Sequence, residues 1–250
     1  MIKAIIIDDE RNSRDIIALM LERYCPDIKI VAMAGDCADG ISKIMEHHPS
    51  LVFLDLEMPD GTGFDVLAGT LPHLHFEAVF VTAFEKKFIH IIRFSDVELI
   101  LKPIDKEGLL QAVNLITERI TSNNIAPRYE ILLENYNNQS SSDWKMLLMD
   151  INGQFSTINI DDISWLESVN EHTLFGLKNK PTITSVQPFR YYAELFIPLH
   201  FYQINNTQMI QLSSIQQIDS NNSKILMNSG HLLDITERRQ KDLLQKLGQR

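Results

Sequence analysis

Leu51-Val52-Phe53-Leu54 is an apolar run that stops at the carboxylate of Asp55. Three further runs in the first half of the chain share this form, an apolar stretch followed by a polar side chain. They are residues 4–7 before Asp8 and Asp9, residues 79–81 before Thr82, and residues 99–101 before Lys102. Short apolar runs between helix-like segments are typical of strands buried on both faces of a parallel sheet. The carboxyl ends of such strands lie at one edge, so we expect these polar side chains in one pocket.

Helix-like segments separate these runs, and a fifth apolar run covers residues 28–34. The amphipathic stretches that predict helices lie at about residues 13–24, 38–47, 63–71, 86–94 and 106–120. Strand and helix alternate through residue 120, which predicts a doubly wound α/β domain with right-handed crossovers.

Three carboxylates, from Asp8, Asp9 and Asp55, are expected to meet at the carboxyl edge of this sheet. Carboxylates at close range raise one another's pKa values unless a cation neutralises them. A divalent ion with oxygen ligands, for which we expect Mg²⁺, resolves the conflict and can bridge an incoming phosphoryl group. Asp55 is then the expected nucleophile and forms an acyl phosphate, while Lys102 and Thr82 contact its phosphoryl oxygens.

The first half of the chain resembles the receiver domain of bacterial two-component response regulators, which has a flavodoxin-like, CheY-like fold. The matching motifs are Asp8-Asp9-Glu10, Leu54-Asp55-Leu56-Glu57-Met58-Pro59-Asp60-Gly61, Thr82-Ala83 and Lys102-Pro103. The resemblance covers residues 1–122 and implies a partner histidine kinase that donates the phosphoryl group.

The same resemblance assigns ligands for the ion. It implies Mg²⁺ bound by Asp9, Asp55 and the backbone carbonyl of Glu57, with Asp8 acting through water. It also implies a cis peptide bond before Pro103. One position departs from the family: Leu99 stands where an aromatic residue is usual, three residues before the lysine, so the usual aromatic switch cannot operate there.

Residues 123–142 break the alternation, and we predict that they link two domains, residues 1–122 and residues 143–250. The stretch Asn135–Ser142 is polar and without periodicity, which is typical of a flexible connection. Ile131-Leu132-Leu133 fits either a final helical turn or an apolar patch within the linker.

From Trp144 the pattern changes to two-residue alternation, which predicts a mainly antiparallel β domain. Asn152-Gly153 between apolar runs indicates a hairpin of residues 145–151 and 154–160. Further predicted strands are residues 163–167, 173–177, 182–186, 209–218 and 224–227. Helices are predicted at about residues 189–195 and after Thr236, the N-cap candidate of a C-terminal helix.

This second half resembles the LytTR family of DNA-binding domains. The resemblance rests on residues 163–168, His172, residues 196–200, residues 204–206 and residues 235–239. It implies a small antiparallel β domain that binds double-stranded DNA through loops and strand ends.

By their positions in the matching segments, the resemblance implies four DNA-contact residues, namely His172, His200, Arg238 and Arg239. Arginine reads guanine or binds phosphate, and histidine donates to base edges or phosphate. Two positions near His200 depart from the family, because Pro198 and Phe201 stand where basic or other polar residues are usual.

The charge of the chain is uneven. Residues 1–120 carry 12 basic and 20 acidic side chains, whereas residues 143–250 carry 10 and 11. An acidic first domain suits a divalent cation. The near-neutral second domain predicts modest non-specific DNA affinity, because counterion release scales with the number of phosphates neutralised.

Composition also bears on location. No apolar stretch approaches the ~18 residues of a membrane span, and no secretion signal opens the chain. The two cysteines, Cys25 and Cys37, match no zinc motif and fit a reducing compartment, the bacterial cytoplasm.

The leading hypothesis is a transcription regulator, not an enzyme, that a sensor histidine kinase phosphorylates on Asp55. Phosphorylation is expected to favour a homodimer, which raises the effective concentration of the second output domain on DNA. The second hypothesis is a phosphorylation-dependent adaptor whose LytTR-like domain binds protein, with Pro198 and Phe201 in the interface. A third, an aspartyl phosphatase, fits less well because such enzymes typically carry Asp-x-Asp, whereas Asp8 and Asp9 are contiguous.

Overall fold

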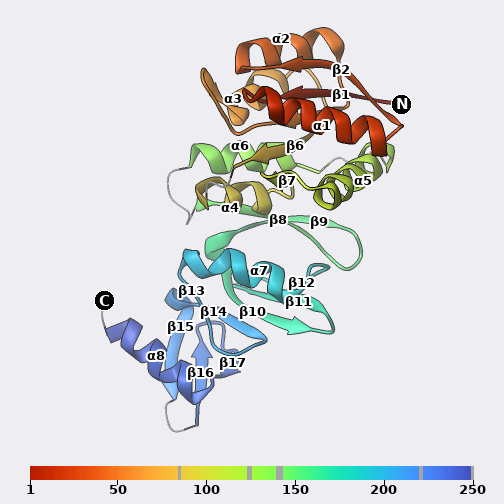
Figure 1. Cartoon of the computed structure of the whole chain (residues 1–250). Helices are drawn as coiled ribbons and strands as arrows, with labels where there is room; N and C mark the ends of the chain where they lie inside the picture. Colours follow the sequence, from red (N-terminus) through yellow and green to blue (C-terminus); the bar gives the residue numbers. More distant parts are fainter. Residues whose placement is uncertain (84–85, 123–125, 139–142, 220–221, 249–250) are drawn as a thin grey trace. The chain divides into compact units, whose positions relative to one another are not determined.

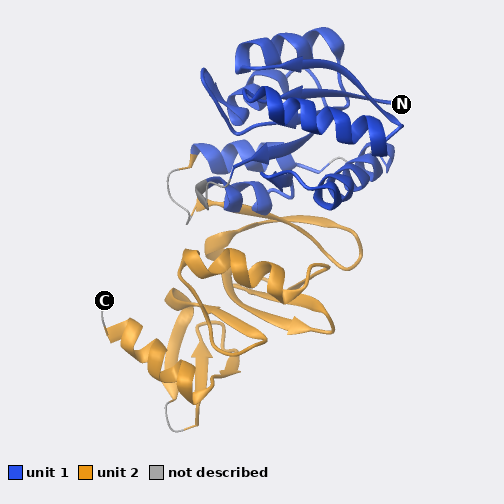
Figure 2. Cartoon of the chain, viewed as in Figure 1, with its two compact units in different colours: residues 1–137 blue, residues 138–250 orange. Residues whose placement is uncertain are grey.

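The computed structural model describes residues 1–250 except 84–85, 123–125, 139–142, 220–221 and 249–250, and except the side chains of residues 86 and 87. The chain forms two compact units, unit 1 (Met1–Asn137) and unit 2 (Asn138–Arg250), as Figure 2 shows. In the part of the chain so described, no helix is both long and apolar enough to cross a bilayer.

Unit 1 is built on a parallel sheet of order β2-β1-β3-β6-β7 (Figure 1). Its strands are β1 (Ile2–Ile7), β2 (Ile28–Ala34), β3 (Leu51–Leu54), β6 (Glu77–Thr82) and β7 (Glu98–Leu101). The connecting helices are α1 (Arg11–Tyr24), α2 (Cys37–His47), α3 (Gly63–Thr70), α4 (Lys86–Phe94) and α5 (Lys106–Ser122). This confirms the predicted doubly wound α/β fold. The structure adds a short ribbon, β4 (Glu57–Met58) and β5 (Gly61–Thr62), which was not predicted.

Helices cover both faces of this sheet, which explains why its strands are mostly apolar. Ile6 and Phe53 belong to a buried cluster that includes side chains of α1 and α5, so these two helices cover one face. On the other face, Phe80 packs against Phe64 of α3, with ring centroids 5.3 Å apart. Polar side chains are therefore left to the strand ends.

A sixth helix, α6 (Arg128–Asn137), also packs on unit 1. The four side chains that it buries are Arg128, Ile131, Leu132 and Asn135. Their spacing of three, one and three residues forms one helical face. The structure therefore shows the helical alternative for residues 131–133. Residues 128–137, which we expected in a flexible linker, instead form a helix that belongs to unit 1. Residues 123–125 and 139–142 of that predicted linker lie outside the described residues.

The described strands of unit 2 pair in antiparallel fashion. They form a five-stranded sheet of order β12-β11-β10-β14-β13, a three-stranded sheet of order β15-β16-β17, and the hairpin β8-β9. The strands of the five-stranded sheet are β10 (Ile163–Val169), β11 (His172–Leu177), β12 (Ile183–Ser185), β13 (Phe201–Gln203) and β14 (Gln208–Gln211). The remaining strands are β8 (Lys145–Met149), β9 (Phe155–Asn159), β15 (Ile215–Asp219), β16 (Lys224–Met227) and β17 (Leu232–Asp234). The antiparallel β architecture is confirmed.

Among its described residues, unit 2 also contains helices and 3₁₀ turns. They are α7 (Phe189–Phe196), α8 (Glu237–Gly248), η2 (Ile160–Asp162), η3 (Ile197–Leu199) and η4 (Leu212–Ser214). The predicted helices at 189–195 and after Thr236 are confirmed. The predicted hairpin is confirmed too, but its loop is longer than Asn152-Gly153, because Asp150 Oδ1 accepts the N–H groups of both Asn152 and Gln154.

The single strand predicted over residues 209–218 is wrong. The turn η4 divides it into β14 and β15, which belong to different sheets. Ser214 in this turn is buried, and its hydroxyl donates to the Gln211 side chain at 2.8 Å. This local hydrogen bond stabilises the turn between the two strands, which the alternating pattern of residues 209–218 does not reveal.

Candidate functional site

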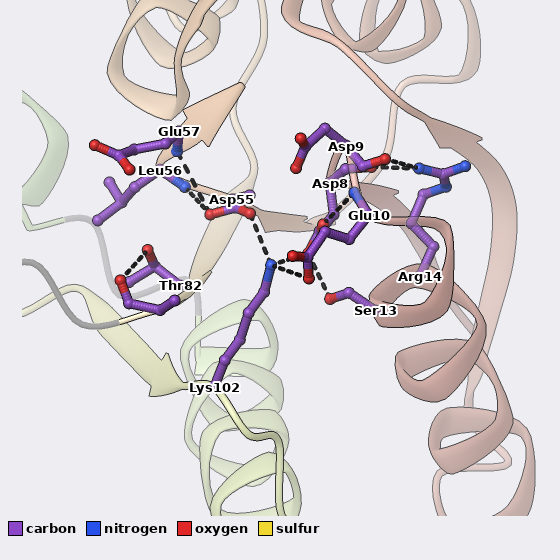
Figure 3. A network of polar contacts seen from close by, with 11 residues as sticks. Asp8, Asp9, Glu10, Ser13, Arg14, Asp55, Leu56, Glu57, Thr82 and Lys102 are labelled. Atoms are coloured by element: carbon purple, nitrogen blue, oxygen red, sulfur yellow. Dashed lines mark hydrogen bonds and ion pairs between the residues drawn. The ribbon is translucent and has the colours of Figure 1, made fainter. Parts of the chain in front are cut away.

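The carboxyl edge of the sheet in unit 1 gathers the polar side chains that follow its strands (Figure 3). Asp8 follows β1, Asp55 follows β3, Thr82 ends β6 and Lys102 follows β7. One carboxylate oxygen from each of Asp8, Asp9 and Asp55 lies within 4.8 Å of the other two. The structure thus brings together the acidic residues that the sequence placed at one edge.

The Lys102 ammonium contacts three carboxylates here. Its Nζ lies 2.8 Å from Asp55 Oδ2, 3.0 Å from Asp8 Oδ2 and 3.4 Å from Glu10 Oε2. Burial alone would lower the pKa of Lys102, but hydrogen bonds and charge interactions with Asp55 and Asp8 outweigh burial and raise that pKa. The side chain therefore stays protonated and neutralises part of the acidic charge. The peptide bond from Lys102 to Pro103 is cis, which confirms the expectation from the resemblance.

The Asp55 carboxylate is buried and has partners on both oxygens. Oδ1 accepts the N–H of Leu56 at 2.6 Å and, at 3.4 Å, that of Glu57, while Oδ2 faces Lys102. Burial raises the pKa of Asp55 above its ordinary value, although the hydrogen bond and charge of Lys102 act in the opposite direction. A further cation at this edge would favour the ionised, nucleophilic form of Asp55.

The loop that carries Asp8 and Asp9 is held by the start of α1 (Figure 3). Ser13 Oγ donates to Asp8 Oδ2 at 2.5 Å, and the backbone N–H of Glu10 donates to Asp8 Oδ1 at 2.9 Å. One guanidinium nitrogen of Arg14 donates to the carbonyl oxygens of Asp8 and Asp9.

Sequence reasoning missed Ser13 and Arg14. A signal for Ser13 was present, because it precedes the buried Ile17 and Leu21 at a spacing of four residues on the same helix. Residues at this spacing share a helical face, so a serine at the top of that apolar stripe indicates a buried hydroxyl. No comparable pattern marks Arg14.

The donors at this edge suit a hard divalent cation. Asp9 is exposed, Asp8 and Asp55 are buried, and all three offer carboxylate oxygens, the ligands that Mg²⁺ prefers. Asp8, Asp55 and Glu10 face the single Lys102 ammonium, and Asp9 lies beside them, so negative charge is in excess and a dication would neutralise it.

The four predicted DNA-contact residues lie at the ends of secondary-structure elements in unit 2. His172 begins β11, after a turn at residues 170–171 in which both residues have positive φ. His200 is exposed, with φ of 62°, between η3 and β13. Arg238 and Arg239 are exposed in the first turn of α8, and the Arg239 guanidinium lies 5.9 Å from the ring centroid of Tyr202.

The register of the five-stranded sheet separates His200 from the start of β11. The turn at residues 204–207 borders that start, because the N–H of Ser168 donates to the carbonyl oxygen of Thr207 at 2.8 Å. The same turn borders the entry to α8, since the Asn205 side-chain amide donates to the carbonyl oxygen of Asp234 at 2.9 Å. His200 lies at the opposite end of the sheet, where Phe201 pairs with Gln211. The structure therefore brings His172 and the start of α8 to one end, and places His200 at the other.

A doubly wound unit with this acidic edge, followed by an antiparallel β unit, defines the class of two-domain response regulators. Two family models match the chain, the response regulator receiver domain over residues 4–114 and the LytTr DNA-binding domain over residues 153–248. The chain belongs to the family of response regulators that combine a receiver domain with a LytTR domain.

Curated relatives match this chain over most or all of its length. An uncharacterized response regulatory protein of Vibrio cholerae is 24% identical over 99% of both chains. The sensory transduction protein LytT of Enterococcus faecalis is 26% identical over 98% of both chains. An uncharacterized response regulatory protein of Shewanella oneidensis is 31% identical over 64% of this chain and 67% of its own. The chain is thus a two-component response regulator that acts as a DNA-binding transcription regulator, and the adaptor alternative is not favoured.

Proposed function

We propose that Asp55 accepts a phosphoryl group from a sensor histidine kinase with the assistance of Mg²⁺. The observation that carries this proposal is the convergence of Asp8, Asp9 and Asp55 within 4.8 Å beside the Lys102 ammonium. Asp9, Asp55 and the carbonyl of Glu57 would hold the ion, with Asp8 acting through water. When bound, the ion supplies charge neutralisation to the transferring phosphoryl oxygens.

The chain's own side chains account for the remaining steps. An Asp55 carboxylate oxygen attacks the phosphorus of the donor phosphohistidine, so an oxygen–phosphorus bond forms while the nitrogen–phosphorus bond breaks, and the released imidazole takes up a proton. Lys102, already 2.8 Å from Asp55 Oδ2, neutralises one phosphoryl oxygen of the product. The Thr82 hydroxyl, at the end of the adjacent strand β6, donates to another.

We further propose that phosphorylation favours a homodimer and thereby raises DNA affinity. The two matched families support a regulator rather than an enzyme. DNA binding by one near-neutral output domain is expected to be weak, so two linked domains on a repeated site gain avidity. Such a regulator would act in the bacterial cytoplasm, where its DNA lies.

The phosphorylation proposal is tested by incubating the full chain with acetyl phosphate, with Mg²⁺ or with EDTA, and measuring intact mass. We expect the mass of one phosphoryl group to be added only with Mg²⁺, and to be lost in Asp55→Asn. Asp15→Asn is a matched control, because Asp15 is exposed on α1 and pairs with Arg11 at 3.7 Å. Retention of the added mass in Asp55→Asn would show that another residue is the acceptor.

The DNA-binding surface is tested with promoter DNA of the protein's own gene, with and without beryllofluoride and Mg²⁺. We expect Arg238→Ala to weaken binding and to reduce the salt dependence of the affinity by about one unit of slope. Arg190→Ala is the control, because Arg190 is exposed on α7 and pairs with Glu194. Comparing His172→Ala with His200→Ala shows which end of the sheet faces DNA. Absence of binding in both states would favour the adaptor hypothesis.

A further inference from the structure

The first turn of α1 contacts the acidic edge through Ser13 and Arg14, two side chains that have no part in the motifs of the phosphorylation site. Asp8 is only 1% exposed, so the orientation of its carboxylate depends on protein donors rather than on bulk water. Those donors are the Ser13 hydroxyl and Lys102 ammonium on Oδ2, and the Glu10 N–H on Oδ1. Ser13 is itself buried and donates at 2.5 Å, a short distance typical of a hydroxyl bound to a carboxylate.

Arg14 acts on the backbone of the same loop. Its guanidinium donates to the carbonyl oxygens of Asp8 and Asp9, which fixes the peptide units on either side of the Asp9 side chain. The helix that carries Arg14 begins without a side-chain cap and without an acidic residue in its first turn. The contacts of Ser13 and Arg14 therefore join α1 to the loop in the place of ordinary capping interactions.

We infer that Ser13 and Arg14 are positioning residues for metal binding: Ser13 fixes the carboxylate of Asp8, and Arg14 fixes the backbone that presents Asp9. This inference rests on the proposed function of the site. Partners that orient the ligands of a metal contribute about 10–100-fold to its affinity. Loss of either side chain should thus weaken Mg²⁺ binding first and slow phosphorylation as a consequence.

The test is Mg²⁺ titration calorimetry on the full chain, accompanied by urea unfolding of each variant. We expect Ser13→Ala and Arg14→Ala to raise the Mg²⁺ dissociation constant by about tenfold. Ser13→Thr keeps the hydroxyl and should remain near wild type. Arg11→Ala is the matched control, because Arg11 is an exposed arginine in the same turn that pairs with Asp15 instead of the loop.

The outcomes separate this inference from the function on which it rests. An unchanged Mg²⁺ dissociation constant in Ser13→Ala and Arg14→Ala, with or without lower stability, overturns the positioning role. Failure of the wild-type chain to bind Mg²⁺ or to gain a phosphoryl group overturns the proposed function instead.

A different set of contacts joins the acidic edge to α6. A Cβ on Gly63 would lie 2.5 Å from the backbone carbonyl of Asp55, so the start of α3 is pressed against the phosphorylation site. The next residue, Phe64, stacks on Tyr136 of α6 with ring centroids 4.3 Å apart, and its ring lies 5.4 Å from that of Phe88 in α4. The rings of Phe64 in α3 and Phe88 in α4 thus both lie next to Tyr136 of α6, so a movement of either helix relative to α6 would alter these contacts.

The opposite end of α6 is fixed by polar contacts at the other edge of the sheet. Arg128 Nε lies 3.0 Å from Asp96 Oδ2, and the Tyr129 hydroxyl donates to Glu77 Oε2 at 3.1 Å, at the start of β6. The helix is thus held at its first turn, whereas its last turn rests on rings that adjoin the phosphorylation site.

We propose that α6 couples phosphorylation to the segment that leaves unit 1, through the contact of Tyr136 with Phe64 and Phe88. This also depends on the proposed function. The test is hydrogen–deuterium exchange of α6 in the full chain, with and without beryllofluoride and Mg²⁺. We expect exchange in the last turn to change about fivefold or more in the wild type, a typical coupling strength. We expect the same change in Tyr136→Phe, which keeps the ring.

The decisive variant is Tyr136→Ala. Loss of the exchange difference, while phosphorylation of Asp55 persists, supports the coupling role. An undiminished difference in Tyr136→Ala, or an absence of any difference in a wild-type chain that is phosphorylated, overturns it. Tyr129→Phe, which removes only a hydroxyl at the fixed end, serves as the control for general loosening of α6.

Discussion

Replacing Lys102 with methionine removes the ammonium that bonds to both buried carboxylates of the site. The Lys102 side chain is 14% exposed, and its partners Asp8 and Asp55 are 1% and 7% exposed. Methionine has a similar length and no charge, so the main change is the loss of the counter-charge. We expect Lys102→Met to destabilise unit 1 strongly when no divalent cation is present.

Two considerations give the size of this effect. Removing one partner of a buried ion pair typically costs about 3–5 kcal/mol, because the other charge stays buried without compensation. Protonation limits the loss, since neutralising one aspartate of ordinary pKa at pH 7 costs about 4 kcal/mol. The free energy of unfolding should therefore fall by about 3–4 kcal/mol at pH 7 in EDTA.

The assay is urea unfolding, in which hydrogen exchange of peptides from β1 and β3 is the readout. These peptides report on unit 1 alone. Adding Mg²⁺ should recover most of the loss, because a ligand that binds only the folded state stabilises that state. Lys3→Met is the control, because the exposed Lys3 donates to the backbone carbonyl of His47, at 3.3 Å, and lies outside the acidic edge. A loss below about 1 kcal/mol, or one that Mg²⁺ does not reduce, would refute the view of Lys102 as the counter-charge.

Three further predictions concern single side chains. Burial lowers the pKa of His90, so the unfolded state binds its proton more readily, and the stability of unit 1 falls as the pH drops below about 6.5. His90→Leu should flatten this decline in thermal unfolding between pH 7.5 and 5.5, whereas leucine at the exposed His75 should not. A Cβ at Gly176 would lie 2.0 Å from the Trp165 ring, so Gly176→Ala should destabilise unit 2 by about 2 kcal/mol or more in urea unfolding monitored by tryptophan fluorescence. Tyr202→Phe removes the hydroxyl that donates to α8, 2.6 Å from Asp242 Oδ2 and 3.0 Å from the carbonyl oxygen of Arg239, and should lower the same free energy by about 1 kcal/mol. Unchanged unfolding midpoints in the last two variants would contradict these packing and hydrogen-bonding arguments.

The parallel sheet and its acidic edge could be predicted because both are local in the sequence. The strands that lead to the site carry apolar runs at their carboxyl ends, and each polar residue of the site directly follows its run, so position along the run fixes position at the edge. The convergence of Asp8, Asp55 and Lys102 needed only the rule that parallel strands share one carboxyl edge.

The features that were not predicted from the sequence depend on how helices and strands are placed relative to one another. Whether Ser13 reaches Asp8 depends on how α1 is rotated against the sheet, which no single segment specifies. The separation of His200 from His172 depends on the register of β13, a strand of three residues that gives no usable periodicity. The resemblance assigned both histidines a role by position, but position along the chain carries no information on which end of a sheet a loop occupies.

The packing of α6 on unit 1 determines where the receiver domain can be truncated. A fragment that ends at Ser122 omits Ile131, Leu132 and Tyr136, and the rings of Phe64 and Phe88 lose their cover. Such a fragment will expose an apolar surface to water and will self-associate for reasons unrelated to signalling. Cutting after Asn137 avoids a false dimer that sizing experiments could mistake for the activated state.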